Sequence, residues 1–547
     1  MIEFVGKGVG GVIVIGKTTH YIAPQIQSEP VKVANIEGEL ARFQAAKELA
    51  TKQLKKLYER ACEEVGEANA QIFDIHRLLL EDSFFQNAVC EKIQTQKVNA
   101  EYALMVTARN FAQKFAAMED TYMQARAVDV QDVSDRLLAC LAGKQEIQND
   151  RTEAAIICAE ELTPSQVVNL EKDKSLAIVT ARGSINSHTA ILARSRGIPA
   201  IVGLGSEFLS QLQEGQEAIV DGLQGRLLLN PDEATKAVYR TMQQAAKKEN
   251  LYLQGLRGKE SRTVDGRKVK LCANVGSLEE IQAAKDNDAE GIGLFRSEAL
   301  YLERAEYPTE EEQFVVYQKA LENMSDKKVV IRTLDVGADK HANYMRLDKE
   351  ENPALGLRGI RVCLTYPEIF KTQLRALYRA SVYGKLGILF PMLTGVKELE
   401  RVLALCEQVK EELDREGKPY AKDVELGIMI ETPAAALISD KLALMVDFFS
   451  VGTNDLTQYT LACDRQNGKL EAFCDTHHEA LLRLIEMSVK NVHASGKWIG
   501  ICGELAADTT LTEEFLRMGI DELSVATDSV LKLREAVRRI DLREWKS

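Results

Sequence analysis

Apolar residues in the first third of the chain recur at spacings of three and four, the period of one face of an amphipathic helix. The pattern includes Leu40, Phe43, Ala46, Ala50, Leu54, Leu57 and Ala61. No proline lies between Pro30 and Pro164, so the strongest helix breaker is missing from this stretch. We therefore predict an all-helical bundle over residues 33–143. Periodicity alone leaves open whether the bundle is a scaffold or a docking surface.

The pattern changes near residue 145, where short apolar runs typical of buried strands predict a compact α/β domain. These runs lie at 176–180, 199–203, 218–222 and 226–229, the last two as a hairpin. The apolar segment 10–16 is a candidate for a further strand of the same domain. The α/β domain then consists of residues 1–32 and 144–231, with the helical bundle as an insertion. The polar helical stretch that follows predicts a linker helix over residues 232–258.

The rest of the chain alternates between short apolar runs and stretches of helical periodicity. The apolar runs lie at 269–275, 291–295, 328–334, 387–393, 426–430, 448–452, 498–502 and 522–526. Eight strands, each followed by a helical connection, over about 290 residues predict a (β/α)8 barrel at residues 259–547. The predicted fold class is thus a multidomain α/β protein, in which an α/β domain with an inserted helical bundle precedes a barrel.

The composition is typical of a globular protein with several domains, because 45% of the 547 residues are hydrophobic and 28% are charged. A net charge of −13 argues against binding to nucleic acid or an anionic membrane surface and favours a basic protein partner. No apolar run approaches the roughly 20 residues of a membrane-spanning helix. The N-terminus lacks a signal-peptide pattern, and the ten cysteines include no CxxC pair. We therefore expect a cytoplasmic protein with reduced thiols.

Residues with reactive or charged side chains lie at the predicted carboxyl ends of the barrel strands, where enzymes of this fold place their active sites. They are Arg296, Arg332, Asp335, Glu431, Asn454, Asp455, Arg465 and Cys502. Guanidinium groups bind phosphate and carboxylate in bidentate fashion, two carboxylates suit Mg²⁺, and a thiol can donate a proton. Each residue alone is more often an ion pair or a packing residue. Their joint position predicts a site for a small, multiply charged anion.

A second candidate site is His188, which opens a predicted helix after a strand and a turn at Gly183. The helix ends near Gly197 and Pro199. Backbone N–H groups and the dipole at a helix N-terminus favour an incoming anion. They also favour the neutral, nucleophilic form of the imidazole. A histidine in this position is more often structural than catalytic, and we interpret the other histidines as structural, except His76.

Several segments together resemble enzyme I of the bacterial phosphotransferase system, the phosphoenolpyruvate–protein phosphotransferase family. The matching segments are 293–298, 332–335, 351–358, 427–433, 447–465 and 502–505. The most specific of them is 447–465, which contains Gly452-Thr453-Asn454-Asp455 and ends at Arg465. The resemblance extends over essentially the whole chain. It implies an enzyme with a swivelling α/β domain and a (β/α)8 barrel that binds phosphoenolpyruvate (PEP).

The resemblance also assigns roles by position. His188 would be the phosphorylated nucleophile, and Cys502 would protonate the enolate to give pyruvate. Glu431 and Asp455 would hold Mg²⁺. The residues that would bind PEP are Arg296, Arg332, Asn454 and Arg465. Members of the family pass the phosphoryl group to the phosphocarrier protein HPr, the first step of sugar uptake, and work as homodimers through their barrels.

The family's helical insert binds HPr, and segments 72–76 and 122–127 resemble it, which makes His76 a docking residue. The segment before His188 departs from the family pattern. Places that usually hold two glycines, a basic residue and a hydroxyl residue are occupied by Gly183, Ser184, Ile185 and Asn186. The nucleophile is unchanged, but docking against the barrel or partner choice would differ.

Two alternatives remain. A pyruvate, phosphate dikinase or PEP synthase would share the histidine and barrel modules, but it needs a large nucleotide-binding domain, and no Gly-rich ATP-binding segment is visible. A regulatory paralogue with weak catalysis would bind a carrier protein without turnover. The changed residues 184–186 favour that alternative, whereas intact Glu431, Asp455, Arg465 and Cys502 argue against it.

Overall fold

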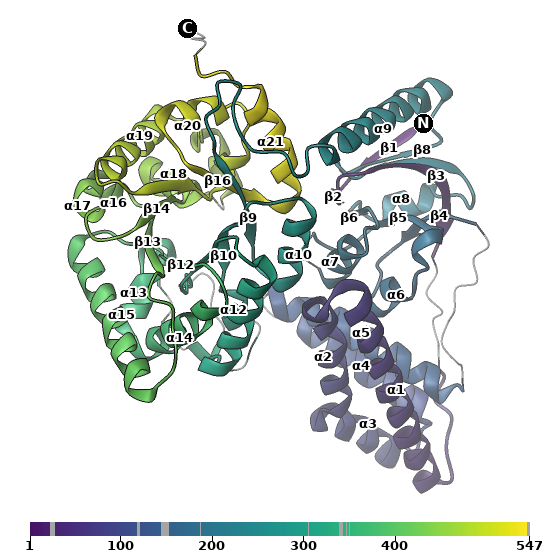
Figure 1. Cartoon of the computed structure of the whole chain (residues 1–547). Coiled ribbons are helices and arrows are strands. Elements are labelled where there is room, and N and C mark those ends of the chain that lie inside the picture. Colours follow the sequence, from purple (N-terminus) through teal and green to yellow (C-terminus); the bar gives the residue numbers. More distant parts are fainter. Residues whose placement is uncertain are drawn as a thin grey trace. The chain divides into compact units, whose positions relative to one another are not determined.

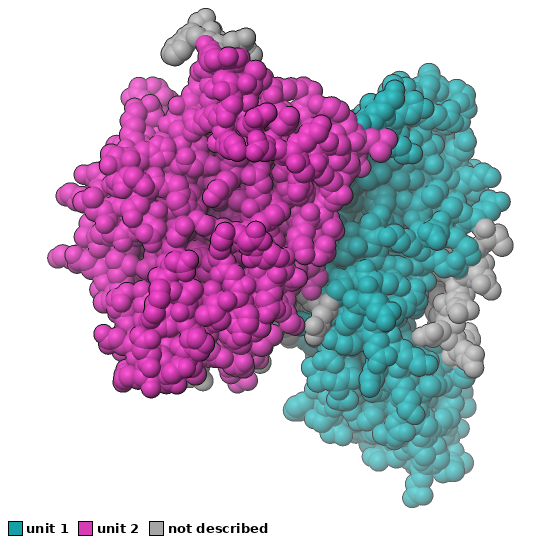
Figure 2. All heavy atoms as spheres, viewed as in Figure 1, with its two compact units in different colours: residues 1–248 teal, residues 249–547 magenta. Residues whose placement is uncertain are grey.

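The computed structural model describes residues 1–21, 28–117, 121–143, 153–185, 187–302, 304, 306–337, 343–345, 347–348, 350–465 and 467–543. The chain divides into two compact units, Met1–Lys248 and Glu249–Ser547 (Figure 2). None of the helices in the described ranges combines the length and apolarity needed to cross a bilayer.

The described part of the first unit contains an eight-stranded sheet in the order β1-β8-β7-β3-β4-β5-β6-β2 (Figure 1). Its strands are β1 (Ile2–Val5), β2 (Lys7–Val9), β3 (Ile13–His20), β4 (Ala155–Ala159), β5 (Ser175–Thr180), β6 (Ala200–Val202), β7 (Glu217–Asp221) and β8 (Arg226–Leu229). β3 pairs in parallel with β4 and antiparallel with β7, so the N-terminal segment and the residues after 153 form one sheet. The predicted strands and hairpin are confirmed, although β3 begins at Ile13 rather than at residue 10. Strands β1, β2 and β4 were not predicted: β1 and β2 have only four and three residues, whereas β4 is a buried apolar run that was missed.

Between β3 and β4 the chain forms helices, as the apolar period predicts. They are α1 (Ile36–Val65), α2 (Glu67–Glu81), α3 (Ser83–Gln96), α4 (Ala100–Ala116) and α5 (Thr121–Leu141). The apolar stripe on α1 is buried from Phe43 to Ala61, whereas Leu40 is only partly buried. The Asn35 side chain accepts a hydrogen bond from the Gly38 N–H and so fixes the start of α1. Because α2 packs against α7, the insert has a direct contact with the α/β part of its unit.

The α/β part also contains α6 (Pro164–Asn169), α7 (His188–Ser195) and α8 (Glu207–Gln211). The helix predicted for the linker is α9 (Glu233–Gln254), and the division between the two units falls within it. Lys236 on α9 forms an ion pair with Glu217 of β7 at 2.6 Å. This pair ties the first turns of α9 to the sheet.

The second unit contains a closed barrel of parallel strands, which confirms the predicted fold class. The strands are β9 (Lys270–Val275), β10 (Ile292–Arg296), β11 (Val329–Arg332), β12 (Leu386–Phe390), β13 (Glu425–Ile430), β14 (Phe448–Val451), β15 (Trp498–Ile501) and β16 (Glu522–Ala526). Pairing of β16 with β9 closes the ring. Leu294, Val330, Leu389, Met429 and Phe448 form a buried apolar cluster together with Cys502. A Cβ at Gly427 would overlap the Phe448 ring, so glycine leaves the space that the ring occupies.

Helices follow the barrel strands (Figure 1). They are α10 (Leu278–Asp286), α11 (Ala299–Leu302), α12 (Glu310–Met324), α13 (Ile360–Thr365), α14 (Pro367–Ala380), α15 (Val396–Glu416), α16 (Pro433–Leu437), α17 (Ser439–Leu442), α18 (Thr453–Leu461), α19 (Glu479–Ala494), α20 (Thr512–Met518) and α21 (Val530–Arg539). Neighbouring helices are joined by ion pairs, such as those of Glu310 with Arg375 and Arg379, both at 2.6 Å. Parallel pairing between the strands fixes their register, so their carboxyl ends lie at one rim.

Candidate active site

A cavity of about 890 Å³ lies at the carboxyl ends of the barrel strands. Its wall includes every barrel residue that the sequence singled out: Arg296, Arg332, Asp335, Glu431, Asn454, Asp455, Arg465 and Cys502. Residues far apart in the sequence meet here because parallel strands of a barrel all end at the same rim. The predicted convergence of arginines, carboxylates, an amide and a thiol is thus present in the structure.

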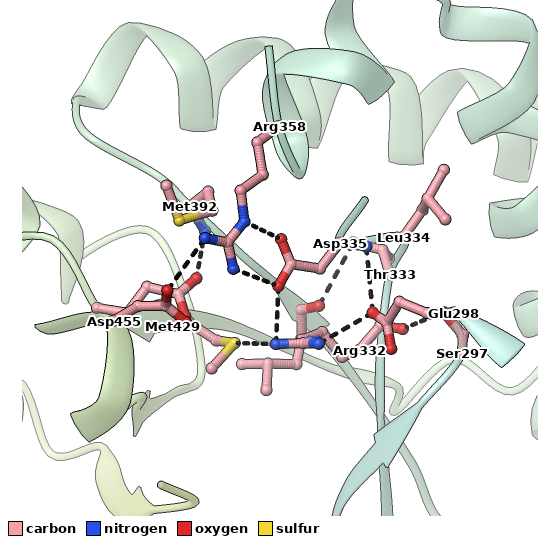
Figure 3. A network of polar contacts seen from close by, with 12 residues as sticks. Ser297, Glu298, Arg332, Thr333, Leu334, Asp335, Arg358, Met392, Met429 and Asp455 are labelled. Atoms are coloured by element: carbon pink, nitrogen blue, oxygen red, sulfur yellow. Dashed lines mark hydrogen bonds and ion pairs between the residues drawn. The ribbon is translucent and has the colours of Figure 1, made fainter. Parts of the chain in front are cut away.

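Two arginines and three carboxylates form a continuous network in this cavity (Figure 3). Arg332 bonds Glu298 and Asp335, each at 3.0 Å. Arg358 contacts the same Asp335 at 3.3 Å and Asp455 at 3.0 Å, and so links the ends of β11 and β14. Because charge-assisted hydrogen bonds are short and directional, this network fixes the two guanidinium planes before any substrate arrives.

Glu431 is the most deeply buried carboxylate of the cavity wall. Its Oε1 accepts a hydrogen bond from the Met392 N–H at 2.6 Å, whereas Oε2 has no hydrogen-bond partner among the described residues. Burial raises the pKa of Glu431 to about 8, with repulsion from Asp335 and Asp455 adding to the effect and Arg332 opposing it. A buried carboxylate oxygen without a partner is costly. A bound cation would remove that cost.

The donor set at this point fits a divalent cation. Glu431 and Asp455 both face the cavity, and a Cβ at Gly452 would lie 2.8 Å from Glu431 Oε2, so glycine leaves the approach to that oxygen open. No group of three or more His, Cys, Asp or Glu side chains suited to a metal exists among the described residues. A cation held here would complete its shell with water and substrate oxygens, which is the usual arrangement for Mg²⁺.

Cys502 follows β15 and is buried, with its thiol 3.6 Å from the carbonyl oxygen of Val451. Burial raises the pKa of Cys502 to about 11, while Ser450 and Arg332 lower it in part. The thiol therefore carries its proton at neutral pH. A protonated thiol that faces the cavity can donate a proton to an anionic carbon, but it is a poor nucleophile.

Arg296 and Arg465 are the exposed guanidinium groups of the cavity. Arg296 is the last residue of β10 and forms no ion pair with the described residues. Arg465 lies 3.7 Å from Asp455, which is too long for a direct hydrogen bond. Both side chains therefore have unused donors for an anionic ligand.

His188 lies in the other unit, at the first position of α7, as predicted. Gly183 has a φ of 103°, a region that favours glycine, and turns the chain from β5 toward α7. The Ser187 side chain accepts a hydrogen bond from the Ala190 N–H and caps the helix. Burial lowers the pKa of His188, Arg126 and His76 lower it further, and Asp129 opposes them. The neutral imidazole expected from the sequence is favoured, with burial as the largest cause.

The prediction that His76 is a docking residue is wrong, because its side chain is completely buried. Its Nε2 lies 3.2 Å from Asp129 Oδ1, and Asp129 Oδ2 accepts a hydrogen bond from Arg126 at the same distance. His76 thus supports Arg126 and Asp129 from within and offers no surface to a partner. The second predicted docking segment includes residues 122–125. The structure does not describe the side chains of residues 121–125, nor does it describe Asn186.

Comparisons with known proteins agree with this geometry. Three models of the PEP-utilising enzyme family match: the N-terminal domain at 5–126, the mobile domain at 151–225 and the PEP-binding domain at 252–542. The phosphoenolpyruvate-protein phosphotransferase of Bacillus sp. (strain S) is 42% identical over 97% of this chain and 92% of its own length. That of Bacillus subtilis (strain 168) is 40% identical over 100% of this chain and 96% of its own. This chain belongs to the PEP-utilising enzyme family.

A solved structure titled as enzyme I (nEIt), determined by NMR, is 34% identical and covers 45% of this chain and 99% of its own, with a TM-score of 0.37. The resemblance inferred from the motifs is confirmed by the curated relatives, which match nearly the whole length. In this PEP-utilising enzyme, the residues that line the cavity all lie within the stretch matched by the PEP-binding domain model.

Sequence reasoning missed the roles of three residues of this PEP-utilising enzyme. Arg358 and Glu298 lie in segments that were matched to the family, yet their bonds to Asp335 and Arg332 become visible only in the folded barrel. Glu504 orients Asn454: its Oε1 accepts a hydrogen bond from Asn454 Nδ2, and its N–H donates to Asn454 Oδ1, both at 3.0 Å. This pairing engages both ends of the Asn454 amide and fixes its orientation.

The raised pKa of Glu431 predicts that divalent cations bind more tightly as pH rises. The folded chain keeps a proton on Glu431 up to about pH 8, whereas an unfolded glutamate loses it near pH 4.5. Without a cation, the folded state therefore loses stability as pH rises through this window. Cation binding must expel that proton, so Mg²⁺ affinity should increase by up to about tenfold per pH unit between pH 6 and 8.

Titration calorimetry of Mg²⁺ binding in two buffers of different ionisation enthalpy measures both the affinity and the proton released. Glu431→Gln should bind the cation weakly and release no proton. A pH-independent affinity in the unsubstituted chain would show that Glu431 is not a ligand.

Proposed function

We propose that this chain is a phosphoenolpyruvate–protein phosphotransferase that transfers the phosphoryl group of PEP first to His188 and then to a carrier protein. The observation that supports this most is one cavity that combines cationic side chains with the buried, protonated thiol of Cys502. PEP needs both, because it brings several negative charges and leaves as an enolate that must be protonated. The neutral imidazole of His188 supplies the acceptor.

Four side chains of the cavity bind the phosphate and carboxylate of PEP: Arg296, Arg332, Asn454 and Arg465. Glu431 and Asp455 would hold Mg²⁺, which when bound neutralises negative charge on the transferring phosphoryl group. Arg358 keeps Asp455 in place through its 3.0 Å ion pair. Positioning and neutralisation of charge by these groups provide most of the catalysis in phosphoryl transfer.

In the transfer step, a ring nitrogen of His188 attacks the phosphorus of PEP, and the bond between phosphorus and the enol oxygen breaks. The Cys502 thiol then gives its proton to the methylene carbon of the enolate, which yields pyruvate. Because His188 and the cavity belong to different compact units, His188 must enter the cavity for this step and leave it afterwards.

For the second transfer we propose HPr as the acceptor, bound by the helical insert at 33–143. The α/β domain that contains His188 then consists of residues 1–32 and 144–231. Residues 232–258 link this part to the barrel at 259–547, and the chain works as a cytoplasmic homodimer through its barrels. A net charge of −13 supports a basic protein partner. The downstream use of the phosphoryl group is sugar uptake.

The proposal predicts labelling of the purified chain by radioactive PEP and Mg²⁺ in the absence of nucleotide. We expect about one acid-labile, alkali-stable phosphate per chain, the stability that distinguishes phosphohistidine from phosphate esters, and an equal amount of pyruvate. Addition of HPr should then move the label to HPr. Labelling that requires a nucleotide would favour a dikinase, and carrier binding without labelling would favour a regulatory paralogue.

A further inference from the structure

A buried glutamine of the barrel unit joins the two chain segments that carry the polar network of the cavity. Gln373 on α14 is 0% exposed and lies outside the cavity wall. Its Oε1 accepts a hydrogen bond from the Leu334 N–H at 2.9 Å, and its Nε2 donates to the hydroxyls of Ser297 and Tyr317, both at 3.0 Å. The amide thus uses its acceptor and both of its donors, and the Leu334 N–H fixes which end is the oxygen.

The contact of Gln373 with Ser297 acts on the end of β10. Ser297 follows the last residue of that strand and lies between Arg296 and Glu298, two residues of the cavity wall. The Ser297 hydroxyl in turn donates a hydrogen bond to the backbone carbonyl of Arg332 at 2.8 Å. A chain of hydrogen bonds therefore runs from α14 through the end of β10 to the end of β11.

The contact with Leu334 acts on the segment after β11 (Figure 3). Leu334 directly precedes Asp335, whose carboxylate bonds Arg332 at 3.0 Å and Arg358 at 3.3 Å. A buried N–H without an acceptor is costly, so the backbone at Leu334 would shift toward another partner if the Gln373 oxygen were lost. Because Asp335 bonds both guanidinium groups, their positions depend on the acceptor that Gln373 provides.

We propose that Gln373 is a positioning residue for PEP, which acts through Arg332 and does not touch the substrate. This inference rests on the proposed function, in which Arg332 binds PEP. A guanidinium group binds phosphate or carboxylate in bidentate fashion only in one orientation of its plane, so a small displacement costs affinity. Gln373 holds the backbone of Arg332 and the carboxylate that orients its side chain, and PEP therefore meets a preorganised guanidinium group.

A second buried glutamine, Gln313 on α12, provides a matched control because it belongs to the same network. It is 1% exposed, and its Nε2 donates to the Pro308 carbonyl at 3.1 Å. Its Oε1 accepts hydrogen bonds from the hydroxyls of Tyr301 at 3.0 Å and Tyr317 at 3.2 Å. Gln313 thus forms as many of these bonds as Gln373, but none of its three partners adjoins a charged residue of the cavity wall.

The test measures PEP binding to the full chain with Mg²⁺, in a His188→Ala background that prevents phosphoryl transfer. Gln373→Met keeps the length of the side chain but removes the acceptor and both donors, and its PEP affinity should fall about tenfold. Gln313→Met should bind PEP as tightly as the parent chain, although both variants should unfold at a lower temperature. Calorimetry separates the two effects, because partial unfolding lowers the binding stoichiometry, whereas a misplaced Arg332 lowers the affinity.

The transfer step gives a second measurement. In the chain that retains His188, Gln373→Met should be labelled about 10²-fold more slowly at saturating PEP, the cost of misplacing a reacting group by roughly 1 Å. Gln313→Met should be labelled at the unsubstituted rate. A loss that remains at saturating PEP cannot come from a reduced number of folded chains once the rate is expressed per binding site.

Ser297→Ala is a milder variant, which decides the matter if Gln373→Met does not fold. It removes only the hydroxyl between Gln373 and the Arg332 carbonyl, and PEP affinity should fall about fivefold. The double variant should lose less affinity than the product of the two single losses, because both residues belong to one chain of hydrogen bonds.

Unchanged PEP affinity in Ser297→Ala and in a folded Gln373→Met overturns the proposal. An equal loss of affinity in Gln313→Met overturns it too, because the network would then have only a general structural role. A parent chain that does not bind PEP disproves the proposed function, and this inference with it. A parent chain that binds PEP with the same affinity whether or not Gln373 is present disproves this inference alone.

Discussion

Replacing His188 with alanine is expected to abolish labelling of the chain by PEP, a loss of at least about 10⁴-fold in transfer rate. The imidazole is the group that accepts the phosphoryl group, and alanine has no nucleophile to replace it. PEP binding should be unchanged, because the residues proposed to bind PEP all belong to the second unit. Labelling with radioactive PEP and calorimetry of PEP binding measure the two quantities separately.

The control is His20→Ala, which removes an exposed histidine from β3 of the same unit. This variant should be labelled as fully as the unsubstituted chain. Stoichiometric labelling that persists in His188→Ala would place the phosphoryl group on another residue and would refute the role of His188. A second chemical check is hydroxylamine and acid treatment, under which the wild-type label should be lost as expected for phosphohistidine.

The barrel could be predicted because parallel strands buried on both faces are continuous apolar runs, whose ends are visible in the sequence. Each of the predicted runs between residues 269 and 526 corresponds to a strand of the closed sheet. Strands β1 and β2 lack this signal, since they are edge strands of only four and three residues. Their position depends on pairing with β8 and β6, which lie some 200 residues away.

Those residues of the candidate site that lie at strand ends could be predicted from the sequence. The ion pairs that join different strand ends could not be predicted, because the pairing of Arg358 with Asp335 and Asp455 depends on the tertiary positions of three separate segments. His76 was misinterpreted although the sequence contained a warning. It lies four residues from both Ile72 and Leu80, on the face of α2 where both of these are buried. A histidine on the apolar face of a helix is more often part of the core than of the surface.

The second large effect is expected at Cys502. Replacement by alanine should lower pyruvate formation by about 10²–10⁴-fold, the range for loss of a positioned general acid. The thiol is protonated at neutral pH because burial raises its pKa to about 11, and it faces the cavity that would contain the enolate. PEP affinity should change little, since a thiol contributes no charge to an anionic ligand. A coupled lactate dehydrogenase assay measures pyruvate, and calorimetry measures binding.

Two further variants separate acid catalysis from packing. Cys502→Ser keeps nearly the same shape but is a much weaker acid, so its pyruvate formation should stay low even though the cavity is filled. Cys406→Ala removes another buried thiol of the same unit, on α15 and outside the cavity wall, and should retain activity. Normal turnover in Cys502→Ala would remove the thiol from the mechanism, and proton delivery would then have to come from water or from another residue of the wall. Full activity in Cys502→Ser with a deep loss in Cys502→Ala would instead assign Cys502 a packing role, since only shape and not acidity would then matter.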